Sequence, residues 1–327
     1  MNIGIIGFGK TGKIRYNSIK ELRPNYNIYY YDSSVKGGVD TVENIIANPS
    51  IDIVIICTPN NSHKNLTIQA LKNNKHIFCE KPPAMNLVEM EEVIKVEKST
   101  NKKLMYGFNH RHRESIKKIK QTIDSKMFGK ILWIRGRYGK EVDENFYNDW
   151  RSKRELAGGG ILMDQGIHML DIFLYLAEDF DDVKAMVSNL YWNLDIEDNV
   201  FALFRNSQTG IVASLHSTMT QWRYLFSLEL FLDRGSLILN GLKTPSGNYG
   251  QEVLTITKNR SSAPSAHWDK EEKIIYEADD SWNNEMKIFL ECIENNTKIL
   301  DGNSKDAFKV MKIIEKIYGN DKLIRTI

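Results

Sequence analysis

The order of apolar and polar positions divides the chain into two regions with different rhythms. In the first third, short β-branched runs alternate with segments of helical length, which indicates βαβ units and a doubly wound parallel sheet. We expect strands at residues 2–7, 27–32, 51–57, 75–80 and 103–108, and helices at residues 11–23, 61–73 and 86–99.

From residue 131 onward, long alternating runs follow one another, which predicts a large, open, mostly antiparallel sheet. We place the domain boundary at Gln121, so that residues 1–121 form the first domain and residues 122–327 the second, with room for the last helix to pack back onto the first. The expected strands are 131–138, 183–192, 200–205, 210–218, 226–232, 236–239 and 252–257, and the expected helices are 161–176, 283–294 and 305–317.

Composition narrows the class of protein. A chain of 327 residues, 42% hydrophobic and 26% charged, is typical of a soluble protein with two domains. Its 44 Lys and Arg against 42 Asp and Glu exclude a nucleic-acid-binding surface of the usual basic kind, and its apolar runs are too short for a membrane span. Because the first residues pass directly into a strand and the three cysteines have no CxxC spacing, we expect a cytoplasmic protein without disulfides.

A glycine-rich turn joins the first expected strand to the first expected helix. The sequence from Gly7 to Gly12 is GxGxxG, and Asp32 ends the second expected strand 20 residues after Gly12. This context predicts a dinucleotide site, with the pyrophosphate at the helix N-terminus and the carboxylate on the ribose hydroxyls. The residues expected at the cofactor are Gly7, Phe8, Gly9, Lys10, Thr11, Gly12, Asp32 and Ser33.

The charge of Asp32 favours NAD over NADP, because it would repel a 2′-phosphate. No arginine follows it at Ser33, Ser34 or Val35, although Lys36 keeps NADP as the less favoured alternative. Two more special turns follow the third and fourth strands, at residues 57–63 and 79–83. In the second of these turns, Pro82 keeps Lys81 out of the helical region, so that its side chain is held outward at the ligand-binding edge of the sheet.

A third constellation lies in the expected helix 161–176, after the glycine run 158–160. Asp164, His168 and Asp171 stand at i, i+4 and i+7 and so would share one helix face. A carboxylate, an imidazole and the Lys81 ammonium form a candidate proton relay for removing a hydroxyl proton as hydride leaves the carbon. The competing interpretation is a helix charge beside a core histidine, and no metal is expected because neither HExxH nor a nearby cysteine is present.

Together these motifs resemble the glucose-fructose oxidoreductase, inositol dehydrogenase and rhizopine-catabolism (Gfo/Idh/MocA) family of NAD(P)-dependent sugar and polyol oxidoreductases. The resemblance rests on GFGKTG, CTPNNSH, CEKP and GGGILMDQGIHMLD in this order over nearly the whole chain. It implies a Rossmann domain followed by an α/β domain whose open sheet forms an oligomer interface. It also implies that Lys81, Asp164 and His168 form the catalytic site, and that the cofactor is lined further by Thr58, Pro59, Asn60, His63, Glu80 and Lys81.

Two further segments supply residues that we expect to contact the substrate. The basic run 109–113 follows the fifth strand, and Arg111 matches the arginine that family members direct at the substrate. A cationic turn there suits a phosphate- or carboxylate-bearing sugar, and the alternative is a set of solvated charges. Trp150 and Arg151 resemble the family's Trp-Arg pair. The expected substrate contacts are Lys81, Asn109, Arg111, Trp150, Arg151, Asp164 and His168.

The sequence thus predicts an NAD-dependent dehydrogenase acting on a ring hydroxyl or ketone of a sugar, cyclitol or nucleotide sugar, in a homodimer or homotetramer. Two alternatives stay open. The NAD is tightly held and recycled for transfer between sugars or epimerisation, or the protein is a non-catalytic NAD(H) sensor that uses this fold for regulation.

Overall fold

The structure is a computed structural model that describes residues 1–258 and 270–320. The chain forms two compact units. The first unit comprises Met1–Asn109, Glu155–Gly158 and Ser281–Lys312, and the second comprises His110–Arg154, Gly159–Asp280 and the chain from Ile313. The main segment of the first unit therefore ends at Asn109, before the boundary proposed at Gln121. The helix at Ser281–Glu294 also belongs to the first unit.

The first unit contains the predicted parallel sheet, in the strand order β2-β1-β3-β4-β5. Its strands are β1 (Asn2–Ile6), β2 (Asn27–Tyr31), β3 (Ile53–Ile56), β4 (His76–Glu80) and β5 (Leu104–Gly107). Every residue of β3 is buried, as expected for a central strand covered on both faces. Because all five strands are parallel, their carboxyl ends lie along one edge of the sheet.

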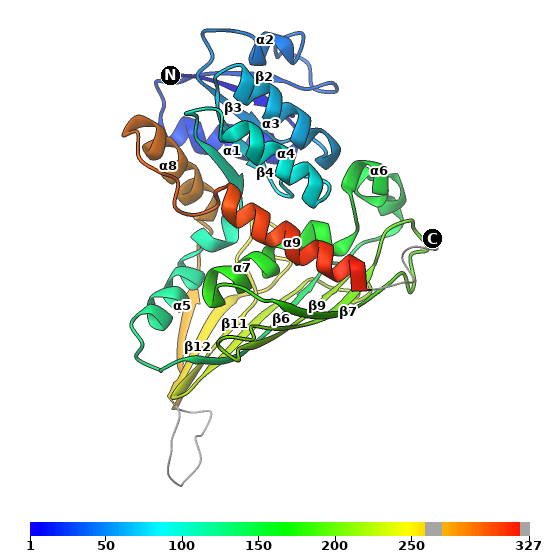
Figure 1. Cartoon of the computed structure of the whole chain (residues 1–327), viewed down its shortest axis with the longest axis vertical. Helices are drawn as coiled ribbons and strands as arrows, with labels where there is room; N and C mark the ends of the chain where they lie inside the picture. Colours follow the sequence, from blue (N-terminus) through cyan, green and yellow to red (C-terminus); the bar gives the residue numbers. More distant parts are fainter. Residues whose placement is uncertain (259–269, 321–327) are drawn as a thin grey trace. The chain divides into compact units, whose positions relative to one another are not determined.

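Helices cover this sheet as a doubly wound fold requires. They are α1 (Lys10–Leu22), α2 (Glu43–Ile46), α3 (His63–Lys72), α4 (Leu87–Glu97) and α8 (Ser281–Glu294). In Figure 1, α3 packs beside α4 and α1 packs beside α8. A core of sheet isoleucines meets Ile19 of α1 and Phe289 of α8, so the apolar stripe of a C-terminal helix completes the N-terminal core.

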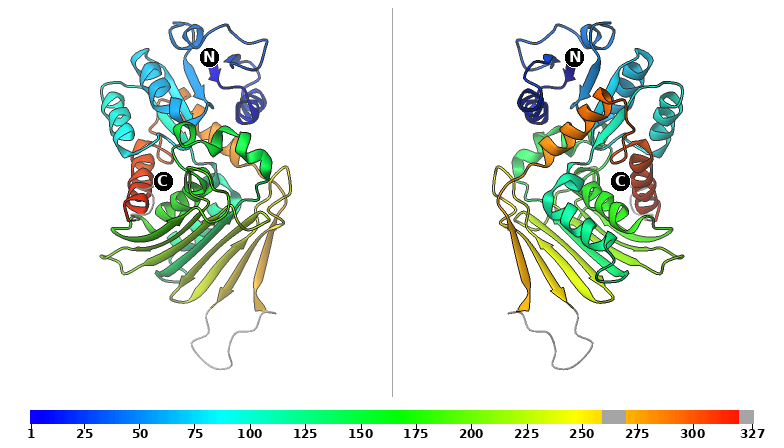
Figure 2. Two further views of the ribbon diagram at one scale, coloured as in Figure 1. Left: turned by 90° about the vertical axis from the view of Figure 1, so that its right-hand side faces the viewer. Right: turned by 90° about the vertical axis from the view of Figure 1, so that its left-hand side faces the viewer.

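The second unit is built on an eight-stranded sheet in the order β13-β12-β11-β10-β6-β9-β8-β7. All neighbours are antiparallel except β6 and β9, which confirms the mostly antiparallel sheet (Figure 2). Its strands are β6 (Ile131–Gly139), β7 (Asp182–Ser188), β8 (Asn199–Arg205), β9 (Val212–Thr218), β10 (Leu225–Leu232), β11 (Gly235–Asn240), β12 (Glu252–Lys258) and β13 (Glu272–Tyr276).

Helices lie against one face of this sheet. They are α5 (Glu114–Asp124), α7 (Ile167–Ala177) and the second-unit part of α9 (Ser304–Asn320), while the short α6 (Arg154–Ala157) joins the units. Helix α7 contacts β6 and β9 and is buried along almost its whole length. No helix in residues 1–258 and 270–320 is both long enough and apolar enough to cross a membrane.

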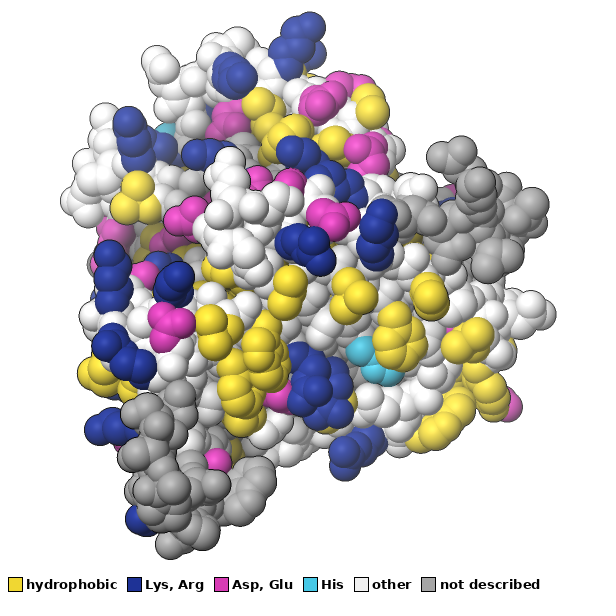
Figure 3. Space-filling model, turned by 60° about the horizontal axis from the view of Figure 1, so that its bottom comes forward, with side chains coloured by type: hydrophobic (Ala, Val, Ile, Leu, Met, Phe, Trp, Pro, Cys, Tyr) yellow, Lys and Arg dark blue, Asp and Glu magenta, His cyan; other side chains and the backbone are white. Residues whose placement is uncertain are grey.

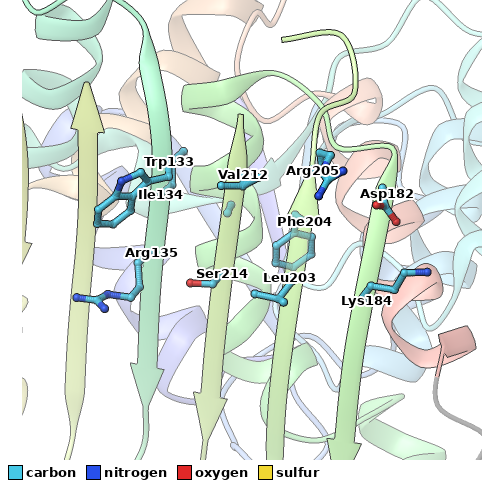
Figure 4. Close-up of a pocket in the computed structure, with 11 residues that line it drawn as sticks. Trp133, Ile134, Arg135, Asp182, Lys184, Leu203, Phe204, Arg205, Val212 and Ser214 are labelled. Atoms are coloured by element: carbon cyan, nitrogen blue, oxygen red, sulfur yellow. The ribbon is translucent and has the colours of Figure 1, made fainter. Parts of the chain in front are cut away.

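The opposite face of the eight-stranded sheet carries exposed apolar side chains. Along β8, the buried Val200, Ala202 and Phe204 alternate with Phe201 and Leu203, which are 52% and 61% exposed. Figure 3 shows such side chains gathered over this face. Trp133, Leu203 and Val212 are among the residues that line a pocket of about 530 Å³ there, and Figure 4 shows them on neighbouring strands. Both faces of the sheet are therefore apolar, which is unusual for a sheet that meets water on one side.

Candidate active site

The glycine-rich turn after β1 has the geometry that a dinucleotide needs. Gly7 has φ +89°, which permits the turn, and a Cβ on Gly12 would lie 2.1 Å from the Gly7 carbonyl oxygen. A Cβ on Gly9, in contrast, would meet nothing within 4 Å. The three glycines thus have different tasks: Gly7 turns the chain, Gly12 allows close packing, and Gly9 leaves open space where backbone can approach a pyrophosphate.

Helix α1 begins at this turn without a side-chain cap. Gly9 is its N-cap residue, so no capping side chain accepts a hydrogen bond from the first backbone N–H groups. These donors and the helix dipole form a site for an anion. The ring of Phe8 stacks on Tyr30 at 3.9 Å between ring centroids and meets Tyr16 edge-on, which anchors the turn on the sheet and helix beside it.

Asp32 lies at the end of β2, beside the turn. Its Oδ2 accepts the Phe8 backbone N–H at 2.6 Å, and its Oδ1 accepts the backbone N–H groups of Ser34 and Val35 at 2.8 and 3.1 Å. Oδ1 thus accepts two hydrogen bonds already, whereas Oδ2 keeps a lone pair for a ribose hydroxyl. The sequence-predicted pairing of the glycine turn with Asp32 is therefore present in the structure.

The turn after β3 is connected to the Lys81 turn through His63. This side chain is fully buried, with Nε2 2.9 Å from the Thr58 carbonyl oxygen and Nδ1 2.7 Å from the Pro82 carbonyl oxygen. Burial lowers the pKa of His63, while these two hydrogen bonds act in the opposite direction. His63 therefore connects the two turns, and a role of its ring at the cofactor stays a prediction.

The other residues of that turn are held in place locally. The hydroxyls of Thr58 and Ser62 lie 2.5 Å apart, and the buried Asn60 donates from Nδ2 to the Ala157 carbonyl oxygen at 2.8 Å. Pro59 precedes the 3₁₀ turn η1 (Asn60–Ser62). This segment occupies the carboxyl end of β3, beside the glycine turn.

Glu80 and Lys81 follow at the end of β4. Lys81 is half-buried, the Lys81–Pro82 peptide bond is cis, and Glu80 is 8% exposed with its carboxylate against Arg15 of α1. The first unit thus gathers the glycine turn, Asp32 and the Lys81 turn on one edge of the parallel sheet. That edge is where an open α/β sheet binds its ligand.

In the second unit, Asp164 lies in a π-helical turn, η5 (Leu162–Gly166), and not in an α-helix. The Ile167 backbone N–H reaches the Leu162 carbonyl, which inserts one residue into the turn before α7 begins. Asp164 therefore lies in the π-helical turn, whereas His168 and Asp171 lie in α7, and a common site for the three side chains stays a prediction. Glycines at 158–160 and 166 allow this departure, since a Cβ on Gly166 would press on Leu162 at 2.9 Å. Such turns occur frequently at functional sites.

Two cations converge on Asp164. Lys140 Nζ lies 2.9 Å from its Oδ2, and Arg151 Nε lies 3.8 Å from its Oδ1. The Arg151 guanidinium also lies 4.3 Å from the Trp150 ring centroid, so the Trp-Arg pair forms a stacked unit beside the carboxylate. Because the Asp164 and Lys140 side chains are each only 18% exposed, this is a partly desolvated ionic cluster.

His168 begins the second cluster of this unit. Its ring stacks on His110 at 4.1 Å with an interplanar angle of 23°, and His110 Nε2 lies 2.9 Å from the Tyr138 hydroxyl. Burial raises the pKa of Tyr138, which keeps its hydroxyl protonated. His168, 6% exposed, is thus held by a stacked imidazole whose own position is fixed by a tyrosine.

The basic run 109–113 is buried, so the alternative of a set of solvated charges was wrong. All five residues are at most 6% exposed. Arg111 forms a bidentate pair with Asp171, at 2.8 and 2.6 Å, and Arg113 pairs with Glu252 and Asp279. Asn109 donates to Ser281 at 3.0 Å. Carboxylates inside the protein thus pair with Arg111 and Arg113, and the contact of Asn109 and Arg111 with substrate stays a prediction.

Sequence reasoning missed Lys140 and Tyr138 in these clusters, and it singled out His110 only as part of the basic run 109–113. Lys140 follows β6 directly, and Tyr138 and His110 belong to the end of β6 and the segment before α5. Their position at strand ends is the one signal that marked them, because no motif or spacing connects them with Asp164 or His168. Among residues 1–258 and 270–320, no group of three or more His, Cys, Asp or Glu side chains is placed to hold a metal ion.

The glycine turn, Asp32 and a second unit with carboxylate, imidazole and lysine groups define a two-domain, dinucleotide-dependent oxidoreductase. Family models agree with this class. A model of the oxidoreductase family with an NAD-binding Rossmann fold matches residues 1–108, and a model of the GFO/IDH/MocA C-terminal domain matches residues 116–238. The chain belongs to the Gfo/Idh/MocA family, and NAD is its cofactor.

Relatives and solved structures extend the comparison. The chain is 27% identical to myo-inositol 2-dehydrogenase of Thermotoga maritima over 74% of this chain and 76% of that protein. It is 29% identical to levoglucosan dehydrogenase of Pseudarthrobacter phenanthrenivorans over 60% and 57%. A structure of levoglucosan dehydrogenase with NADH and levoglucosan has a TM-score of 0.84 at 22% identity, covering 99% of this chain and 98% of that one.

Proposed function

We propose that this oxidoreductase transfers hydride directly between NAD and a ring hydroxyl or ketone of a sugar, cyclitol or nucleotide sugar. The observation that carries the proposal is the single sheet edge that holds the glycine turn, Asp32 and the Lys81 turn. The family supplies the reaction class, and relatives named for inositol, levoglucosan and glucosides supply the substrate class. NAD fits the charge of Asp32 better than NADP does.

We assign the chemistry to Lys81, Asp164 and His168. Oxidation of an alcohol requires a group that takes the hydroxyl proton and a group that stabilises the developing negative charge. His168 is our choice for the base, because a neutral imidazole titrates near neutral pH, and the Lys81 ammonium is our choice for the oxyanion. Asp164, whose charge is balanced by Lys140 and Arg151, orients the substrate hydroxyl. Trp150 and Arg151 contact the sugar.

Alanine variants test these roles. Lys81→Ala and His168→Ala should each lower kcat by about 10²- to 10⁴-fold, the usual contribution of a positioned acid or base. The affinity of His168→Ala for NAD should change little, since the glycine turn and Asp32 are untouched. Near-normal turnover in both variants would overturn the assignment, and a loss in only one of them would identify the residue that accepts the proton.

A substrate panel separates the proposal from its alternatives. Native mass spectrometry first shows whether NAD copurifies, and sugars, cyclitols and nucleotide sugars are then added with excess NAD while the reduced nicotinamide band is followed. Repeated turnover with one panel member supports the dehydrogenase. A single reduction of retained NAD, with no release, favours internal recycling between sugars. Bound NAD without any reduction across the panel favours a sensor.

The exposed apolar face of the eight-stranded sheet leads us to propose a homodimer or homotetramer. Its side chains include Leu132, Met186, Phe201, Leu203 and Val212, all more than 40% exposed. A second copy is the occupant that would cover such a self-complementary patch. Leu203→Asp should therefore yield a smaller species in sedimentation velocity, whereas Val88→Asp, at an exposed apolar position on α4, should not. An unchanged mass for Leu203→Asp would contradict this interface.

We also propose a cytoplasmic location. Cys57, Cys79 and Cys292 are all free thiols, which suits a reducing compartment.

A further inference from the structure

Arg15 of α1 is the largest fully buried side chain of the chain's described part, and it carries a full charge. Its guanidinium bonds two carboxylates. Nε and Nη2 each lie 2.7 Å from Glu80 Oε1, and Nη2 lies 2.6 Å from Glu285 Oε2 on α8. One buried cation therefore joins three elements: the helix that begins at the glycine turn, the end of β4 and a helix from the C-terminal part of the chain.

Aromatic rings fix the plane of this guanidinium. Its central carbon lies 4.3 Å from the Phe78 ring centroid and 4.5 Å from the Trp282 ring centroid. The planar, delocalised charge of arginine suits this combination of ring contacts and forked hydrogen bonds, whereas lysine would keep only the charge. Phe78 comes from β4 and Trp282 from α8, so the same two elements that supply the carboxylates also supply the rings.

On its other side, the Glu80 carboxylate packs against Gly107, which has no side chain. A Cβ on Gly107 would lie 2.7 Å from Glu80 Oε2 and 3.3 Å from Arg15 Nη2. The glycine at the end of β5 thus leaves the room that the Arg15–Glu80 pair occupies. The Glu80 carboxylate is therefore confined between the Arg15 guanidinium and Gly107.

Charge balance makes Arg15 necessary for Glu80. Burial alone would lower the pKa of Arg15, but the charges of Glu80 and Glu285 raise it above its ordinary value. Without the guanidinium, Glu80 would be a buried carboxylate that has lost its cation, a state that proteins relieve by protonation or movement. Either response would disturb the backbone at the next residue, Lys81.

We propose that Arg15, fixed by Glu285, is a positioning residue that sets the Glu80–Lys81 turn and so places the Lys81 ammonium for the reaction. The inference rests on the proposed role of Lys81. Helix α1 would then have two tasks. Its N-terminus faces the pyrophosphate, and Arg15, in the second helical turn, holds the Glu80–Lys81 turn.

The test compares Arg15→Met with Arg15→Lys, Glu285→Gln and the matched control Arg23→Met. Arg23 also joins α1 to α8, through Glu294, but at the surface and away from Glu80. Each variant is measured for kcat with the panel sugar that reduces NAD fastest, levoglucosan and myo-inositol being the first probes. NAD affinity and thermal unfolding are measured alongside.

We expect Arg15→Met to lower kcat by about 10- to 100-fold, the usual effect of a displacement of about 1 Å, with NAD affinity near the wild-type value. Arg15→Lys should recover part of the loss, Glu285→Gln should show a smaller one, and Arg23→Met should show none. Wild-type kcat in folded Arg15→Met would overturn the inference, as would an equal fall in Arg23→Met.

Three further outcomes are decisive. If Arg15→Met does not fold, Arg15→Lys and Glu285→Gln carry the test, and wild-type kcat in both would overturn the inference. If Lys81→Ala itself turns over normally, the proposed function of Lys81 has failed. A normal Arg15→Met beside an inactive Lys81→Ala contradicts the positioning role alone.

Discussion

The Asp32 carboxylate accepts the Phe8 backbone N–H at 2.6 Å, so the end of β2 is tied directly to the glycine turn after β1. The same carboxylate holds the Ser34 and Val35 backbone N–H groups. A residue assigned to the ribose from sequence spacing is therefore also a structural anchor of the phosphate turn. Its two tasks can be separated, because one needs only a hydrogen-bond acceptor and the other depends on negative charge.

Asp32→Asn should shift cofactor preference towards NADP. Asparagine keeps one acceptor oxygen for the Phe8 N–H, and it removes both the acceptor for the Ser34 and Val35 N–H groups and the charge that repels a 2′-phosphate. We expect the NAD-to-NADP ratio of kcat/KM to fall by about tenfold or more, corresponding to about 1.4 kcal/mol. Steady-state kinetics with both cofactors measures it. An unchanged ratio would mean that Asp32 does not face the 2′ position.

Gly9→Ala and Gly12→Ala should have opposite consequences. Gly9 has φ −69° and open space around its missing Cβ, so alanine fits the fold but intrudes where the pyrophosphate approaches. We expect unchanged thermal unfolding without NAD and an NAD dissociation constant raised by about tenfold or more. Gly12→Ala forces a Cβ to 2.1 Å from the Gly7 oxygen and should destabilise the protein even without cofactor. Wild-type NAD affinity in Gly9→Ala would contradict a dinucleotide at this turn.

Arg111→Met should damage stability rather than substrate binding. The guanidinium is buried against Asp171, and removing one partner of a buried ion pair costs about 3–5 kcal/mol. The double variant Arg111→Met with Asp171→Leu removes both charges and should regain much of that loss. Urea unfolding measures both. If Arg111 instead contacted substrate, the single variant would raise KM with little change in unfolding free energy.

Stability should fall in acid partly through His76. Burial, with the charges of Lys102 and Lys103, lowers the pKa of His76 from 6.5 to about 4, and its Nδ1 accepts the Lys103 backbone N–H at 3.1 Å. Between these values the unfolded chain binds a proton that the folded chain does not, so this contribution is complete above about pH 6.5 and is lost as the pH falls towards about 4. His76→Gln cannot take up that proton, and its unfolding free energy should decline less over this range. Parallel curves for the two proteins would contradict this contribution.

The first unit was largely predictable because its signals are local. Strand, GxGxxG turn, helix and Asp32 all lie within one stretch of chain, and each glycine fits the task that its spacing assigned to it. The mostly antiparallel sheet of the second unit was predictable from consecutive segments in which apolar and polar residues alternate. The insertion of β6 between β10 and β9 depends instead on long-range pairing, which periodicity does not encode.

Partners distant in sequence and irregular helix geometry were not predictable. The run 109–113 looks exposed and basic until folding brings Asp171, Glu252 and Asp279 to it. The π-helical turn that holds Asp164 inserts one residue before α7, which the spacing of apolar positions does not indicate. Lys140 was missed because a lysine after a strand is ordinary until its partner is known.

Direct hydride transfer is the central claim, and deuterium tests it most directly. The protein is mixed with NAD and panel sugars or cyclitols that carry deuterium on the oxidisable carbons, and the nicotinamide product is analysed by mass spectrometry. We predict that one substrate places its deuterium on the nicotinamide ring and that Lys81→Ala suppresses the transfer. Reduced cofactor without deuterium, or no reduction of either free or bound NAD by any labelled substrate, would contradict the account.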